Sequence, residues 1–298
     1  MVVSLIAFVR ATDLDSVLAS VSRVGYNFVW LLLLTGGAYY SAAISWRYCL
    51  GHSCKKLSAF RLFLIRHIGE TVGLFNPTSV VGGDAVKVVL LGNYGIDRKR
   101  VIASVVLSRL ILIASQLALF LLTVLGIVLQ GSAFKEAPLQ AQAMGLYSFV
   151  YSKTNGVRVK IADILKELYP FFRNHKKALA WSAVFALLHW LLGAFEFFFI
   201  LKFLGVEVTV LQALLIDLGV VFFKAAGAFI PGQIGVEEFG NKLMLASIGV
   251  PDPEIWISAS ILRRARQLVW VALGAFAWLF LYRQHHLSAK ARPLPVKE

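Results

Sequence analysis

Long apolar runs, separated by short basic or glycine- and proline-containing stretches, dominate the sequence. Five runs are long enough to cross a bilayer as helices: Asn27–Leu50, Val101–Gln130, Ala178–Leu204, Thr209–Ile230 and Glu254–Tyr282. Each has about 20 residues or more, the length that a helix needs to cross ~30 Å of hydrocarbon. The pattern therefore predicts an all-α integral membrane protein, folded as a polytopic helix bundle.

Two other apolar stretches are too short for a regular span. Phe60–Asn76 is short and contains several charged residues, and Met1–Val9 lacks the charged region and cleavage site of a signal peptide. We expect residues 1–26 to be an interfacial segment or a truncated helix. The apolar part of residues 132–151 is likewise shorter than a span, so a truncated helix is one interpretation there too.

The composition agrees with a membrane protein. The 298 residues are 58% hydrophobic and 15% charged, whereas soluble domains average about 25% charged residues. Mean hydropathy is +0.74. The net charge of +14 is explained by basic loops beside anionic lipid, so no nucleic-acid partner is inferred.

The sequence also repeats itself at an offset of 154 residues (227 minus 73). The segment Gly73-Leu74-Phe75-Asn76-Pro77 aligns with Gly227-Ala228-Phe229-Ile230-Pro231. The same offset pairs Asp84 with Glu238 and Arg109 with Arg263. A duplicated unit that breaks an apolar helix at a proline and then places charges at membrane depth is common in proteins that move material across bilayers.

This repeat suggests a division of the chain into five parts. They are an N-terminal segment (1–26), membrane repeat 1 (27–131), a connecting segment with an amphipathic interfacial helix (132–177), membrane repeat 2 (178–283) and a cytoplasmic tail (284–298). Within the connecting segment, apolar and charged residues alternate at helical spacing over 157–172, which fits a helix on the membrane surface or a packed linker helix.

Basic residues orient the predicted spans. Arg47 lies at the end of the first span and Lys55, Lys56 and Arg61 follow it, while Arg98-Lys99-Arg100 precede the second, so both of those ends should be cytoplasmic. The loops 205–208 and 251–254 contain no basic residue, whereas the C-terminal tail does, which places these loops outside and the C-terminus inside. We therefore expect a multi-pass protein of the cytoplasmic (inner) membrane with its C-terminus in the cytoplasm.

That orientation gives two inverted structural repeats, each containing a Pro-tipped re-entrant helical hairpin. One hairpin would enter from each face, with tips that could meet near the midplane. The tip residues would be Pro77, Gly82, Gly83, Pro231, Gly232 and Gly235. Irregular backbone at that depth must be buried in protein or line a wet cavity.

Charged residues near these tips are the candidate substrate contacts. They are Arg109, Arg263, Asp84, Glu238, Lys87 and Arg264. Buried charges are costly inside a bilayer, and two interpretations stay open. The carboxylates pair internally with the arginines, or the arginines line an electropositive groove and bind a lipid phosphate through their planar guanidinium groups. Both interpretations hold together if these ion pairs open and close and so form the gate.

Further charged residues lie within or near the spans. They are Glu70, Glu196, Asp217 and Lys224. Glu196 could relay protons, or be a neutral carboxyl or one bonded to Lys202 or His189.

Signals for enzymatic chemistry are weak. The stretch Gly82-Gly83-Asp84-Ala85-Val86-Lys87 lacks the Gly-Lys-Ser/Thr of a P-loop, and no metalloprotease, nucleophile-elbow or dinucleotide-binding motif occurs. Cys49 and Cys54 are interpreted as free thiols. We therefore predict no catalytic residue, no metal and no cofactor.

The two proline–acid motifs resemble those of the transmembrane region of the lysylphosphatidylglycerol synthase family, a flippase-like family with stand-alone members. The first matching motif is Pro77-x4-Gly82-Gly83-Asp84 with Ser104-x4-Arg109. The second is Pro231-Gly232-Gln233-Ile234-Gly235-Val236-Glu237-Glu238 with Leu262-Arg263. The likeness runs from about Asn27 to Tyr282.

This resemblance implies a lipid translocase, of flippase or scramblase type, that moves a phospholipid or lipid-linked intermediate between leaflets. Relatives are linked to aminoacylated phosphatidylglycerol, polyprenyl-linked sugars or hopanoid pathways. The aminoacyltransferase domain of two-domain members is absent from this sequence, so lipid synthesis is not implied. Two alternatives remain: a membrane-embedded transferase with Asp84 or Glu238 as base, and a non-transporting scaffold for lipid-modifying enzymes.

Overall fold

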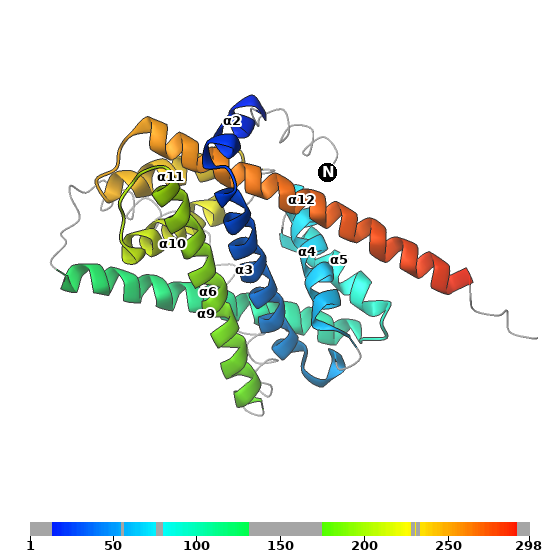
Figure 1. The fold of residues 1–298 in the computed structure, drawn as a ribbon. Coiled ribbons are helices and arrows are strands. Elements are labelled where there is room, and N and C mark those ends of the chain that lie inside the picture. Colours follow the sequence, from blue (N-terminus) through cyan, green and yellow to red (C-terminus); the bar gives the residue numbers. More distant parts are fainter. Residues whose placement is uncertain are drawn as a thin grey trace, which may run out of the picture.

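A computed structural model describes residues 14–54, 57–75, 80–130, 175–227, 230 and 233–290. Over these ranges the chain is helical apart from short connections, and no strand is present (Figure 1). The elements are α2 (Leu14–Val24), α3 (Asn27–Leu50), the 3-10 turn η1 (Gly51–Cys54), α4 (Ala59–Phe75), α5 (Val80–Gly92), α6 (Arg98–Leu129), α9 (Lys176–Phe203), α10 (Val210–Ala226), α11 (Val236–Ser247) and α12 (Pro253–Lys290). The prediction of an all-α fold is confirmed.

Four of the described helices are long and apolar enough to cross a membrane. They are α3, α6, α9 and the part of α12 from Pro253 to Leu281. The fifth predicted span, Thr209–Ile230, is shorter than expected, because α10 ends at Ala226 and Gly227 follows as its C-cap. Its 17 residues make about 25 Å of helix, less than the ~30 Å of a hydrocarbon core.

The helix boundaries repeat at the offset found in the sequence. Moving α4 by 154 residues places it on 213–229, which overlaps α10, and moving α5 places it on 234–246, which overlaps α11. Helices α3 and α6 fall in the same way on 181–204 and 252–283, within or next to α9 and α12. Each half therefore consists of a long helix, a pair of shorter helices and a second long helix.

The first long helices of the two halves, α3 and α9, pack against each other over much of their length. The hydroxyl groups of Ser45 and Ser182 lie 2.9 Å apart, and Nδ1 of His189 donates to the carbonyl of Ala38 at 2.8 Å. Thr35 contacts Glu196 at 3.2 Å. Because residue numbers fall along α3 as they rise along α9, the two equivalent helices are antiparallel.

The contacts between the two halves are also duplicated. Helix α4 packs against α12, and its counterpart α10 packs against α6, the counterpart of α12. Nε2 of His67 donates to the carbonyl of Trp270 at 2.7 Å. Nε2 of Gln116, which lies 154 residues before Trp270, donates to the carbonyl of Leu218 at 3.3 Å. The two halves are therefore joined by two similar crossings, visible around α3 and α9 in Figure 1.

The predicted tip glycines have distinct roles. Gly83 lies inside α5, where a Cβ atom would collide with the backbone of Gly69 on α4, so a missing side chain permits close packing of the pair. Gly82 lies beside it in α5. Gly235 is the N-cap of α11 with φ +81°, a left-handed conformation that glycine adopts without steric cost. Pro77, Pro231 and Gly232 lie outside the described residues.

Both cysteines are free and buried. Burial raises the pKa of the Cys54 thiol, which keeps it protonated and unreactive. The segment predicted to carry an amphipathic surface helix, 157–172, lies outside the described residues.

Candidate functional site

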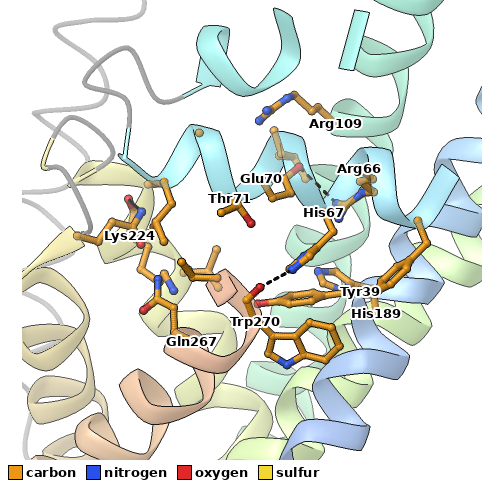
Figure 2. A pocket seen from close by; sticks show the side chains of 18 of the residues that line it. Tyr39, Arg66, His67, Glu70, Thr71, Arg109, His189, Lys224, Gln267 and Trp270 are labelled. Atoms are coloured by element: carbon orange, nitrogen blue, oxygen red, sulfur yellow. Dashed lines mark hydrogen bonds and ion pairs between the residues drawn. The ribbon is translucent and has the colours of Figure 1, made fainter. Parts of the chain in front are cut away.

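A cavity of about 600 Å³ lies between the two halves of the protein. The first half contributes residues from α3, α4 and α6, and the second half contributes residues from α9, α10 and α12. Four charged side chains line it: Arg66, Glu70, Arg109 and Lys224 (Figure 2). The side chains of Glu70 and Arg109 remain 46% and 36% exposed, so the charged part of the cavity is open to the surroundings of the protein.

The charges of the first half meet around Asp84, a residue of α5. Arg109 donates two hydrogen bonds to its carboxylate, from Nε to Oδ2 at 2.8 Å and from Nη2 to Oδ1 at 2.9 Å. Lys87 donates to Asp84 Oδ1 at 3.0 Å and to Glu70 Oε1 at 2.6 Å. Arg66 lies 3.9 Å from Glu70. We call these five residues the first-repeat cluster.

Helix spacing explains part of this arrangement. Residues three or four positions apart lie on one face of a helix, and both the Asp84–Lys87 and the Arg66–Glu70 pairs have that spacing. The close approach of α4 and α5 at their glycines then brings Lys87 to Glu70. Lys87 is only 5% exposed, so two carboxylates compensate the cost of burying its charge.

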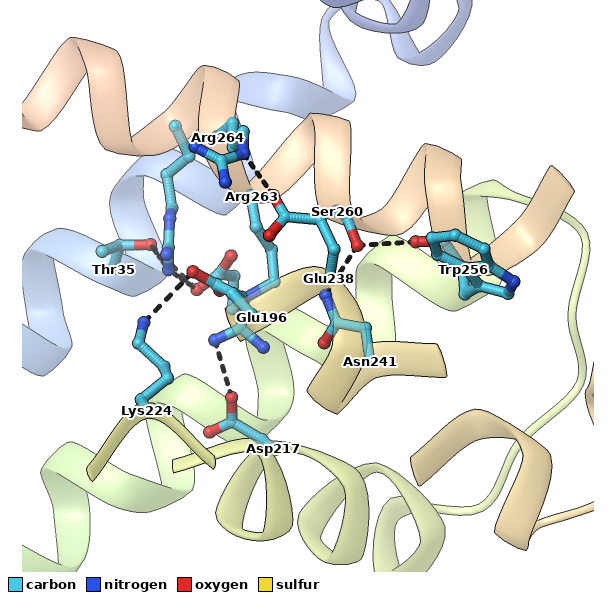
Figure 3. A network of polar contacts seen from close by, with 12 residues as sticks. Thr35, Glu196, Asp217, Lys224, Glu238, Asn241, Trp256, Ser260, Arg263 and Arg264 are labelled. Carbon is cyan, nitrogen blue, oxygen red and sulfur yellow. Dashed lines mark hydrogen bonds and ion pairs between the residues drawn. The ribbon is translucent and has the colours of Figure 1, made fainter. Parts of the chain in front are cut away.

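The second half contains a larger and drier network (Figure 3). Arg263 on α12 lies 3.0 Å from Asp217 on α10 and 2.7 Å from Glu237 on α11. Lys224 bonds to Glu237 at 3.2 Å. Arg263, Asp217 and Glu237 are each between 6% and 7% exposed. One arginine thus joins three helices of this half.

Two further arginines of α12 complete this network. Arg264 is paired with Glu238. Arg266 is paired with Glu196 on α9, which also contacts Thr35 on α3. We call eight paired charged residues of this half the second-repeat cluster: Glu196, Asp217, Lys224, Glu237, Glu238, Arg263, Arg264 and Arg266.

A family model of the lysylphosphatidylglycerol synthase TM region matches residues 1–275. The chain belongs to this family. No curated protein and no solved structure matches the chain. Membership makes this multi-pass membrane protein a relative of proteins of lipid modification or transport.

In this member of the lysylphosphatidylglycerol synthase TM family, the carboxylates pair internally with basic residues, as the first of the two interpretations of the sequence expects. Asp84 pairs with Arg109, one of its two expected partners. Glu238 pairs with Arg264 rather than with Arg109 or Arg263, because neighbouring residues of a helix point about 100° apart. Glu196 pairs with Arg266 and Thr35, not with Lys202 or His189.

The candidate contacts of this family member divide between cavity and interior. Arg109 lines the cavity and is held from behind by Asp84, which also accepts a hydrogen bond from Lys87. Of the described residues, those that line the cavity do not include Arg263, Arg264 or Glu238. These three belong to the buried network of the second half.

Sequence reasoning missed the aromatic wall of the cavity in this family member. Tyr39, His67 and Trp270 pack with ring centroids between 5.2 and 5.7 Å apart, next to Thr71 and Gln267 (Figure 2). One signal was available, since Arg66, His67, Glu70 and Thr71 have the spacing of one polar helix face. Nothing in the sequence placed Tyr39 or Gln267 opposite that face.

Proposed function

We propose that this protein is a membrane lipid translocase that moves a phospholipid or lipid-linked intermediate between the leaflets of the bacterial inner membrane. The observation that carries the proposal is the cavity between the two repeats, with charged and polar side chains on part of its wall and apolar side chains on another part. A lipid has the same division between a phosphate headgroup and hydrocarbon chains.

Arg109 is the headgroup contact that the geometry favours. Its guanidinium has five N–H donors, and Asp84 receives hydrogen bonds from Nε and Nη2. Asp84 thereby fixes the plane of the guanidinium, and the other donors suit a phosphate oxygen at the cavity surface. Lys224 adds a cation from the opposite repeat to the same cavity, beside Arg66 and Arg109.

Another part of the lining is apolar and is suited to hydrocarbon. Phe63 and Leu74 on α4, Ile113 on α6, and Val221 and Val271 on the second repeat all line the cavity. An acyl or polyprenyl chain beside these side chains would keep its apolar surface out of water. A soluble anion would leave that part of the lining unused.

The arrangement of the halves supports inverted repeats. Antiparallel packing of α3 and α9, together with the matched crossings of α4 on α12 and α10 on α6, suits hairpins α4–α5 and α10–α11 that enter from opposite faces. Basic residues near the predicted inner ends support a cytoplasmic C-terminus. Transporters of this design bind cargo where their repeats meet.

The transferase alternative has less support. A general base needs a carboxylate that can accept a proton, and both Asp84 and Glu238 are held by arginines. The scaffold alternative leaves the cavity without a role. Neither alternative is favoured by a particular contact among the described residues.

The proposal is tested by transbilayer lipid movement in proteoliposomes with headgroup-labelled phosphatidylglycerol. Wild type should move the lipid, and Arg109→Ala should be slower by about tenfold or more, which corresponds to about 1.4 kcal/mol of lost interaction. Arg61→Ala is the matched control, because Arg61 is an exposed arginine on α4. No movement by folded wild-type protein, or equal rates in wild type and Arg109→Ala, would contradict the proposal.

A further inference from the structure

The two charged clusters differ in their balance of charge. In the second-repeat cluster, four cations face four carboxylates, so the cluster is neutral. In the first-repeat cluster, Arg66, Lys87 and Arg109 face Asp84 and Glu70. Three cations and two carboxylates leave one positive charge, with His67 and His189 counted as neutral.

The uncompensated charge lies at the cavity. Lys87 is buried between two carboxylates, whereas Arg66 and Arg109 line the cavity. Figure 2 shows these two arginines approaching Glu70 from two sides. Arg66 is the more loosely held, at 3.9 Å from its carboxylate, while Arg109 is fixed by Asp84.

An unbalanced charge inside a bilayer is costly, and a ligand of opposite charge removes that cost. One negative charge makes the interior neutral. A zwitterionic headgroup leaves the excess positive charge in place, and a dianion reverses it. The balance of charges therefore selects among headgroups before any contact with the rest of the lipid.

Resting on the lipid translocation proposed above, we infer that the cavity takes a lipid headgroup with a single net negative charge, a phosphodiester monoanion, and that Arg66 and Glu70 set this preference. Glu70 limits the positive charge to one unit. Arg66 supplies the unit that the carboxylates do not neutralise. Neither residue belongs to the repeat motifs, since the positions 154 residues later are Val220 and Lys224.

The test compares three labelled lipids in the same proteoliposomes: phosphatidylglycerol (one negative charge), phosphatidylethanolamine (zwitterionic) and phosphatidic acid at about pH 8, where a phosphate monoester with a second pKa near 6 is a dianion. Wild type should move phosphatidylglycerol fastest, by about tenfold, since one unit of charge at close range is worth more than 1.4 kcal/mol in a protein. Equal rates for the three lipids would overturn the inference and leave translocation standing.

Two charge variants make the test specific. Arg66→Gln removes the excess charge and should bring the rates for phosphatidylglycerol and phosphatidylethanolamine within about twofold. Glu70→Gln raises the excess to two and should favour phosphatidic acid over phosphatidylglycerol. Arg61→Gln changes the total charge as much as Arg66→Gln but at an exposed position of the same helix, so it should keep wild-type selectivity. Unchanged selectivity in both cavity variants would contradict the roles of Arg66 and Glu70.

A binding measurement keeps the inference testable if a variant transports poorly. The purified proteins are incubated with mixed vesicles of the three lipids, and the retained lipids are identified by mass spectrometry. Retention should follow the same order as transport. Absence of transport with selective retention would reject translocation but support the charge preference, and unselective retention would reject the preference.

Soluble glycerophosphoglycerol separates the two sources of a phosphodiester. It has the headgroup of phosphatidylglycerol without the chains. If the site is built for lipid, this compound should displace retained phosphatidylglycerol only at concentrations at least about tenfold higher, because it gains nothing from the apolar lining. Displacement at equal concentration would show a site for soluble anions and overturn the assignment to lipid.

Discussion

Glu70 and Lys224 occupy equivalent positions in the two repeats, 154 residues apart, and line the same cavity with opposite charges. Each is bonded within its own hairpin, Glu70 to Lys87 at 2.6 Å and Lys224 to Glu237 at 3.2 Å. In the first repeat the acid lies on α4 and the base on α5, whereas in the second repeat the base lies on α10 and the acid on α11. The cavity is therefore asymmetric in charge although its frame is duplicated.

Because Glu237 is also paired with Arg263, removal of Lys224 should affect function more than stability. In Lys224→Gln, Glu237 keeps Arg263 at 2.7 Å, so we expect a loss of stability smaller than the about 3–5 kcal/mol that breaking a fully buried pair costs. Lipid movement should fall, because one of the cavity cations is lost. Thermal unfolding in detergent and proteoliposome assays measure the two effects. A large fall in melting temperature with wild-type transport would contradict this prediction.

The two repeat-related arginines should separate stability from transport. Arg263 is 7% exposed between two carboxylates, and removing one partner of a buried ion pair costs about 3–5 kcal/mol. Arg263→Gln should therefore lower the melting temperature strongly. Arg109→Gln should unfold near the wild-type temperature yet move lipid slowly, because Arg109 is partly exposed to the cavity. The reverse order of stabilities would show that Arg109 is the structural arginine.

Much of the frame could be predicted from the sequence. The offset of 154 residues matches the positions of the two pairs of short helices, α4–α5 and α10–α11. Asp84 bonds to Arg109, one of the two partners that the internal-pairing interpretation left open, whereas Glu238 bonds to an arginine outside that choice. The end of α10 was placed four residues too late, as the apolar run continues past Gly227 to Ile230.

The partners within the second half could not be predicted. Arg263, Arg264 and Arg266 are close in sequence, but Arg263 meets carboxylates on α10 and α11, Arg264 meets one on α11 and Arg266 meets one on α9. Only the packing of α9, α10 and α11 around α12 decides those pairs. The same is true of Tyr39 and Gln267, which reach the cavity through tertiary contacts.

The packing of α4 on α5 should depend on Gly83. A methyl group there would collide with the backbone of Gly69, and backbone cannot move aside cheaply, so Gly83→Ala should destabilise by about 1–3 kcal/mol. Gly92→Ala is the control within α5, since nothing lies within 4 Å of its added Cβ. Alanine is the better helix former, so this variant should unfold at or above the wild-type temperature. Equal melting temperatures for the two variants would show that the helices do not meet at Gly83.

Antiparallel α3 and α9 lead to a prediction about the two faces of the membrane. If the repeats are inverted, the connection after α5 and the equivalent connection after α11 lie on opposite sides. Asn93 and Pro251 are exposed residues of these connections.

In a protein whose two buried cysteines are replaced by serine, Asn93→Cys and Pro251→Cys provide one thiol each for a membrane-impermeant maleimide. In intact cells without an outer membrane, Pro251→Cys should be labelled at once and Asn93→Cys only after permeabilisation. Labelling of both from the same side would mean that the repeats are parallel, and the two hairpins would then enter the membrane from one face.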